Sequence, residues 1–137
     1  MNPRTLYLIK RAEIEVTNGM LKTLADHKIT AIQFTVLYFV DHNKGDLSSA
    51  QLSRRFSMTP QSMSELVSVL EKKKLLKKTV DSFHKRILRL RLTEKGLKLL
   101  NDCNHILDSL EEELLGDLSK SEIKTLRKLL GKILKSD

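Results

Sequence analysis

The apolar residues of this 137-residue sequence change their spacing partway along the chain, and that change restricts the possible folds strongly. Over 60–73 they follow the period of an α-helix, with positions i, i+3, i+4 and i+7 occupied by Met63, Leu66, Val67 and Leu70. Over 88–92 leucines alternate with arginines, as in a strand with one buried face. With helical patterns on both sides, this switch predicts a mainly α fold that contains one β-hairpin.

Start and stop residues divide the chain into six expected helices and two expected strands. The helices are predicted over 4–27, 31–42, 49–55, 60–73, 94–115 and about 120–134, and the strands over 75–80 and 86–92. Residues suited to cap the later helices are Thr30, Ser48 or Ser49, Thr59 ahead of Pro60, Thr93, and Ser119 with Glu122.

The net charge of +8 is confined to one segment. The range from Arg54 to Lys95 holds 12 basic and 4 acidic residues, whereas the remainder is neutral with 13 of each. Charge held on about a third of the chain indicates one basic surface, which attracts a polyanion through counterion release. Charge alone leaves open a solvated basic face without a specific partner.

Two short helices joined by a tight turn, over 49–55 and 60–73, are typical of a helix-turn-helix. The polar face of the second helix carries Gln61, Ser62, Ser64, Glu65 and Ser68. Gln and Ser side chains can bind base edges in the major groove, and a helix N-terminus favours nearby phosphate. An ordinary solvated helix face explains the same pattern equally well.

The hairpin that follows favours the DNA-binding interpretation. Its basic residues are Lys77, Lys78, Lys85, Arg86, Arg89 and Arg91. An arginine at the tip of a β-ribbon can enter a narrow minor groove, and lysines along the strands can neutralise phosphates. A helix-turn-helix followed directly by a basic hairpin is a winged helix, with the wing expected over 80–87 and double-stranded DNA as the predicted partner.

In their order and spacing these segments resemble the MarR family of bacterial regulators, from about Ile29 to Leu134. The matching pieces are 29–37, 52–56, 58–71, 81–86, 92–96 and 118–122. The resemblance implies a homodimer on a palindromic operator, in which 30–93 forms the winged DNA-binding lobe. The segments 1–29 and 94–137 would supply the dimerisation helices of this single MarR-type domain.

The resemblance also assigns roles to residues. The expected DNA contacts are Ser48, Thr59, Gln61, Ser62, Ser64, Glu65, Lys77, Lys85, Arg86 and Arg89, with Arg86 as the wing arginine of the minor groove. Family members often bind small effectors between the dimer helices and the winged lobe. Here the expected lining is Phe34, Tyr38, Cys103 and Leu107. The expected function is that of a transcriptional regulator. We expect it to act as a repressor that such an effector releases from its operator.

Three residues depart from the family pattern. Glu65 stands where the family commonly has Arg; its carboxylate repels phosphate but can accept from a cytosine amino group. His84 replaces the usual wing Asp, which removes a salt bridge expected to orient the wing. Lys74 replaces the usual Gly after the recognition helix, so a non-glycine residue is expected at positive φ.

Other classes of site find little support in the sequence. Cys103 lies among leucines and isoleucines and is expected to be a packed core thiol rather than a redox sensor. The four histidines lack metal-ligand spacing, and no phosphate loop or nucleophile elbow is present, so no cofactor, metal or enzyme activity is expected. The single cysteine and the absence of a long apolar run predict a cytoplasmic protein outside the membrane.

Two alternative functions remain at this point. A winged-helix interaction module or antirepressor that has lost operator specificity is suggested by Glu65. A general architectural DNA-binding protein would show salt-sensitive affinity with little preference among sequences.

Overall fold

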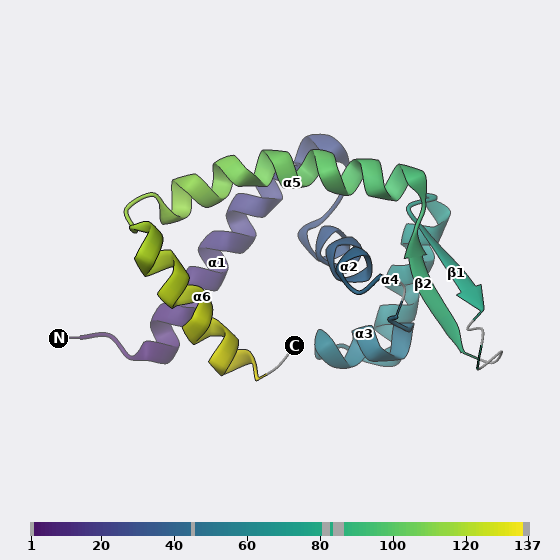
Figure 1. The fold of residues 1–137 in the computed structure, drawn as a ribbon, viewed down its shortest axis with the longest axis horizontal. Helices are drawn as coiled ribbons and strands as arrows, with labels where there is room; N and C mark the ends of the chain where they lie inside the picture. Colours follow the sequence, from purple (N-terminus) through teal and green to yellow (C-terminus); the bar gives the residue numbers. More distant parts are fainter. Residues whose placement is uncertain (1, 45, 81–82, 84–86, 136–137) are drawn as a thin grey trace. The chain divides into compact units, whose positions relative to one another are not determined.

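The computed structural model describes residues 2–44, 46–80, 83 and 87–135. Within them the fold is mainly helical with one antiparallel strand pair (Figure 1). The elements in chain order are α1 (Thr5–Leu24), the 3₁₀ helix η1 (Ala25–His27), α2 (Ala31–His42), α3 (Ser49–Arg55), α4 (Pro60–Lys72), β1 (Leu76–Val80), β2 (Leu88–Leu92), α5 (Glu94–Leu115) and α6 (Lys120–Leu134). The predicted fold class is therefore confirmed.

Side-chain caps set the points where the helices begin. The side chains of Thr30, Ser48 and Ser119 each accept a hydrogen bond from the backbone three residues on, and the Gln or Glu there bonds back to the cap. These reciprocal pairs satisfy backbone N–H groups that a helix start leaves without partners. Because the signal is local in sequence, these three helix starts were predictable.

The helix ends show a second local feature, which is a residue with positive φ. After α4, Lys74 has a φ of 62°. Lys74 N–H donates to the Glu71 carbonyl at 2.9 Å, and Leu75 N–H donates to the Leu70 carbonyl at 2.9 Å. This is a Schellman arrangement, usually completed by glycine. The expectation of a non-glycine residue at positive φ is confirmed.

The two strands form a hairpin that is joined to the helices. Leu76 pairs with Leu92 and Val80 with Leu88. Leu90 is the buried residue of β2, and its N–H donates to the carbonyl of Leu47 at 2.9 Å. β2 contacts α2 and α3, and β1 contacts α4. The hairpin therefore shares the core of the helix-turn-helix.

The chain divides into two compact units, one of them Leu24–Asn104. Among the described residues, all the buried apolar side chains of the chain lie in this unit. They are Leu24, Ile29, Phe34, Val36, Leu37, Val40, Leu47, Leu52, Met63, Val67, Leu70, Leu75, Leu76, Leu90, Leu100 and Cys103. We call this unit the winged lobe, and it has a core of its own.

The second unit comprises Met1–Thr23 and His105–Asp137. It contains α1, the second half of α5 and α6. None of its described residues is fully buried, and many of its large apolar side chains are exposed. On α1 and α6 these include Leu6, Tyr7, Leu8, Ile9, Ile14, Val16, Leu21, Leu129, Leu130, Ile133 and Leu134. By itself this unit lacks a closed core.

Candidate nucleic-acid interface

The start of α4 is fixed by Thr59 and Pro60. Thr59 has extended backbone, and its Oγ1 accepts a hydrogen bond from the Ser62 N–H at 3.1 Å. Pro60 occupies the first helical position, where its missing N–H costs no hydrogen bond. Thr59, predicted as a DNA contact, is thus also the N-cap, and it presents the first turn of α4 in a defined geometry.

α4 has one apolar and one polar face. Met63, Val67 and Leu70 are completely buried and hold the helix against the lobe. On the polar face, Gln61, Ser62, Ser64 and Glu65 are all exposed, as predicted. Burial of the apolar stripe therefore fixes which side chains face solvent.

The polar side chains of α4 are largely free to bind a ligand. Gln61, Ser64 and Glu65 form no side-chain hydrogen bond or ion pair with any residue that the structure describes. Ser62 Oγ accepts from Thr59 Oγ1 at 2.9 Å and keeps further hydrogen-bonding capacity. The free groups include donors, acceptors and one carboxylate, which suits them to read base edges.

Ser48 lies at the start of α3, where it is half-buried. Its Oγ accepts from the Gln51 N–H at 3.3 Å, and its own N–H donates to Gln51 Oε1 at 2.8 Å. The cap therefore occupies the serine hydroxyl at least in part. Its contact with DNA stays a prediction.

Arg89, on β2, is engaged inside the lobe. Its Nη1 donates to the carbonyl of Asp46 at 3.0 Å and to Gln51 Oε1 at 3.1 Å. Arg89 thereby ties the wing to the start of α3. Gln51, which accepts from both Ser48 and Arg89, is a positioning residue that the sequence analysis missed. The serine-to-glutamine spacing of three was the signal that could have identified its capping half.

The strands place the remaining basic residues in different environments. Lys77 and Arg91 are exposed and directly opposite each other across the hairpin. Like charges in that arrangement repel, so a bound anion such as a phosphate would stabilise them. Lys78, in contrast, forms an ion pair with Glu71 at 3.3 Å. Lys77 therefore remains available for phosphate.

The wing tip lies mostly outside the described residues. Lys85 and Arg86, the two tip residues predicted to contact DNA, fall there, and so does His84. Their roles stay predictions from the sequence. Phe83 is described, and 90% of its surface is exposed.

The four residues expected to line an effector site have different environments. In the winged lobe Phe34 and Cys103 are buried, whereas Tyr38 is 44% exposed and its ring centroid lies 6.5 Å from that of Phe34. Burial, and secondarily the charge of Asp102, raise the pKa of Cys103, so the thiol stays protonated at neutral pH. The prediction of a packed core thiol is confirmed.

Leu107 belongs to the second unit. It lines an apolar hollow of about 260 Å³ between α1 and α5, together with Val16, Met20, Leu110, Glu111, Leu114 and Leu115. The joint effector site of Phe34, Tyr38, Cys103 and Leu107 stays a prediction.

Two other kinds of feature are absent from the described residues. No group of three His, Cys, Asp or Glu side chains among the described residues is placed to hold a metal ion. In that same part of the chain, no helix combines the length and apolar character needed to cross a membrane.

The chain is similar in sequence to known proteins. Residues 27–87 match the sequence model of the MarR family. The chain is 27% identical over 128 residues to the HTH-type transcriptional regulator MhqR of Bacillus subtilis, covering 92% of this chain and 86% of MhqR.

Solved structures extend the similarity over nearly the whole chain. The crystal structure of the MepR–DNA complex of S. aureus has a TM-score of 0.80 and 26% identity, covering 96% of this chain and 94% of MepR. CouR of Rhodococcus jostii RHA1, bound to p-coumaroyl-CoA, has a TM-score of 0.86 at 19% identity, covering 96% and 92% of the two chains.

Proposed function

We propose that this chain is a member of the MarR family and a DNA-binding transcriptional regulator that binds a palindromic operator as a homodimer. The observation that carries this function is the capped first turn of α4, with Gln61, Ser64 and Glu65 exposed and without partners in the described part of the chain. The chain is also similar in fold and sequence to MepR, whose crystal structure is a complex with DNA, and this similarity supports the same role.

Base reading is assigned to the polar face of α4 in the major groove. A glutamine can pair with adenine through two hydrogen bonds, and serine can bond to several bases. Glu65 accepts but cannot donate when ionised, and the base that offers it a major-groove amino donor with no neighbouring acceptor is cytosine. We therefore assign a cytosine preference to Glu65.

The homodimer is supported by the second unit. α1 and α6 expose a series of leucine and isoleucine side chains, and no described residue of this unit is fully buried. Contiguous exposed apolar surface on a small protein marks an association site. A second copy of the same unit would cover these helices, and two-fold symmetry would then place the two copies of α4 on the two halves of a palindrome.

The wing and the effector complete the proposal. Lys77 and the tip residue Arg86 would contact the DNA backbone and the minor groove. A small molecule bound near Tyr38, Phe34, Cys103 and Leu107 would release the operator and so relieve repression. CouR, which has the same fold, was solved with p-coumaroyl-CoA bound.

The test is selection of bound sequences from random duplex DNA, followed by affinity measurements at a fixed salt concentration. We expect a two-fold symmetric site that contains a cytosine in each half. Glu65→Gln is expected to reduce the preference for that cytosine by about tenfold or more, since a good base contact contributes roughly 1–3 kcal/mol of discrimination. Asp26→Asn, which removes the same charge from an exposed position on η1, is the matched control and is expected to change nothing.

Two outcomes would refute parts of the proposal. Failure to enrich any sequence would favour an interaction module, for which the carboxylate of Glu65 on the reading face is the specific argument. Salt-dependent binding without sequence preference would instead indicate an architectural DNA-binding protein.

A further inference from the structure

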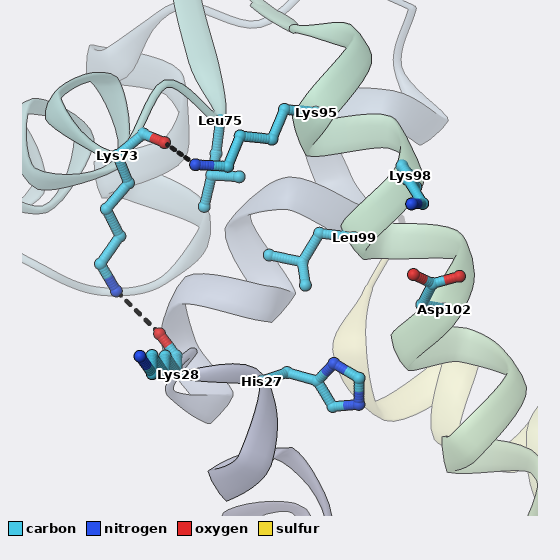
Figure 2. Close-up of a pocket in the computed structure, with 8 residues that line it drawn as sticks. All are labelled: His27, Lys28, Lys73, Leu75, Lys95, Lys98, Leu99 and Asp102. Atoms are coloured by element: carbon cyan, nitrogen blue, oxygen red, sulfur yellow. Dashed lines mark hydrogen bonds between the residues drawn. The ribbon is translucent and has the colours of Figure 1, made fainter.

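A hollow of about 490 Å³ lies in the winged lobe, away from the residues assigned to DNA (Figure 2). Its walls come from the turn after η1, the C-terminal end of α4, the residue preceding β1, and the first turns of α5. The lining residues are His27, Lys28, Lys73, Leu75, Lys95, Lys98, Leu99 and Asp102. Four lysines and a single carboxylate give the hollow a positive charge.

Two of the lysines hold the walls together. Lys73 Nζ donates to the carbonyl of Lys28 at 2.9 Å and to Gln33 Oε1 at 3.3 Å. Lys95 Nζ donates to the carbonyl of Lys73 at 3.1 Å (Figure 2). These bonds link the turn before α2, the end of α4 and the start of α5. These bonds therefore fix the positions of the segments that line the hollow.

The other two lysines have no such role. The ammonium groups of Lys28 and Lys98 form no hydrogen bond or ion pair with any residue that the structure describes. Asp102 lies four residues after Lys98 on α5, yet no ion pair joins them within 4 Å. Two uncompensated cations thus border a hollow whose other two cations are fixed.

This charge is poorly placed to bind the operator. Lys73 and Leu75 follow the last turn of α4, whereas the base-reading residues occupy its first turns. A helix of 13 residues is about 20 Å long, so the hollow lies about that far from the capped N-terminus of α4. A separate ligand is the simpler explanation for the positive charge.

The apolar residues of the hollow define the class of that ligand. Leu75 is buried, and Figure 2 shows Leu99 projecting from α5 into the space between Lys73 and His27. A volume of this size lies within the range of small-molecule sites. We propose that this hollow binds an organic carboxylate with an apolar body, whose negative charge is attracted by Lys28 and Lys98 on either side of the hollow and whose body lies against Leu99.

This site differs from the expected effector site. Its α5 residues are 95, 98, 99 and 102, whereas Cys103 and the neighbouring Leu100 face the core of the lobe. All its lining residues belong to the winged lobe. The proposal therefore requires neither the dimer nor DNA.

The test is calorimetric titration of the full-length protein without DNA. The probes are benzoate and octanoate, with benzyl alcohol as a neutral analogue and inorganic phosphate as an anion without an apolar body. We expect saturable binding of at least one carboxylate, with one site per chain, and at least tenfold weaker binding of benzyl alcohol and phosphate. Lys98→Gln and Lys28→Gln are each expected to weaken carboxylate binding at least fivefold. Lys124→Gln, which removes an exposed lysine from α6, is the control and leaves it unchanged.

Three results would overturn the site. They are the absence of saturable binding by either carboxylate, unchanged affinity in both Lys98→Gln and Lys28→Gln, and equally tight binding of phosphate or benzyl alcohol. Circular dichroism of each variant checks folding, and Lys98 is exposed without partners among the described residues, so Lys98→Gln is expected to fold normally. Because no DNA is present, failure of the operator assay would not affect this result.

Discussion

Replacing Gly96 by alanine tests how α5 is joined to the hairpin. Gly96 is buried in the first turn of α5, where its N–H donates to Thr93 Oγ1 at 3.0 Å. A Cβ at this position would collide with the carbonyl oxygen of Leu75 and lie 3.0 Å from the carbonyl carbon. Both atoms belong to the backbone. That same carbonyl accepts a hydrogen bond from the Thr93 N–H at 3.1 Å, so it cannot move away without losing this bond.

Two opposing effects set the magnitude. Alanine favours a helix interior over glycine by roughly 0.5–1 kcal/mol. Overpacking a close contact costs about 1–3 kcal/mol, and a backbone neighbour places Gly96→Ala at the upper end of that range. We therefore expect a net loss of about 2–2.5 kcal/mol from the free energy of unfolding. For a unit of this size, such a loss lowers Tm by roughly 8–20 °C.

The assay is thermal unfolding followed by circular dichroism, at one protein concentration because dimer stability depends on it. Gly131→Ala is the matched control. Gly131 lies on the face of α6 that also carries Lys124 and Lys128, and a Cβ there meets no atom within 4 Å. Gly131→Ala is expected to raise Tm slightly through helix propensity alone. Equal or higher stability of Gly96→Ala would refute the close approach of α5 to the strand.

Three further substitutions or reactions test other local features. Lys74→Gly is expected to raise the free energy of unfolding by roughly 1 kcal/mol in urea denaturation, because glycine adopts positive φ without the Cβ clash; a loss would contradict the Schellman geometry. Arg89→Ala is expected to destabilise the lobe by about 1–2 kcal/mol, since two hydrogen bonds to α3 and its preceding loop are lost, and Arg89→Lys should restore little of it. Cys103 is expected to react with a thiol reagent at pH 7 only in denaturant, because burial raises its pKa; rapid labelling of the native protein would show an accessible thiolate.

The elements that local chemistry specifies were predicted closely. Thr30, Ser48, Thr59 and Ser119 begin helices as expected, because an N-cap and its partner are three residues apart and need no tertiary contact. The long apolar stripe of α4 likewise fixed which of its residues face solvent.

Boundaries that depend on tertiary structure were less accurate. The first helix was expected to continue to residue 27, whereas α1 ends at Leu24 and a 3₁₀ turn follows. The first strand was expected from residue 75, but Leu75 completes the helix-terminating motif of α4 and β1 begins at Leu76. The burial of Leu75 satisfies both patterns, so hydrophobicity alone could not distinguish them.

Charge was the least reliable guide to individual contacts. The sequence localised the positive charge to Arg54–Lys95, yet in the described part of that segment four cations use their charged groups in hydrogen bonds or ion pairs inside the protein. Lys73 and Lys95 bond to backbone carbonyls, Lys78 pairs with Glu71, and Arg89 bonds to α3 and its preceding loop. Their partners lie from 7 to 45 residues away in sequence, so no local pattern could have identified them.

These internal bonds change what the positive segment implies about DNA. The slope of affinity against salt reports how many phosphates are neutralised, and a cation already bonded to a carbonyl or carboxylate contributes little to it. We therefore expect the winged lobe to make fewer phosphate contacts than its charge count suggests. Lys95 uses its charge at the C-terminal end of α4, where helix carbonyls attract cations, because its Nζ donates to the carbonyl of Lys73. Lys73 instead donates to the carbonyl of Lys28 and to Gln33, so both lysines are used to position the end of α4. We therefore expect specificity to depend on the few free side chains at the opposite end of the same helix, among which Glu65 carries a charge.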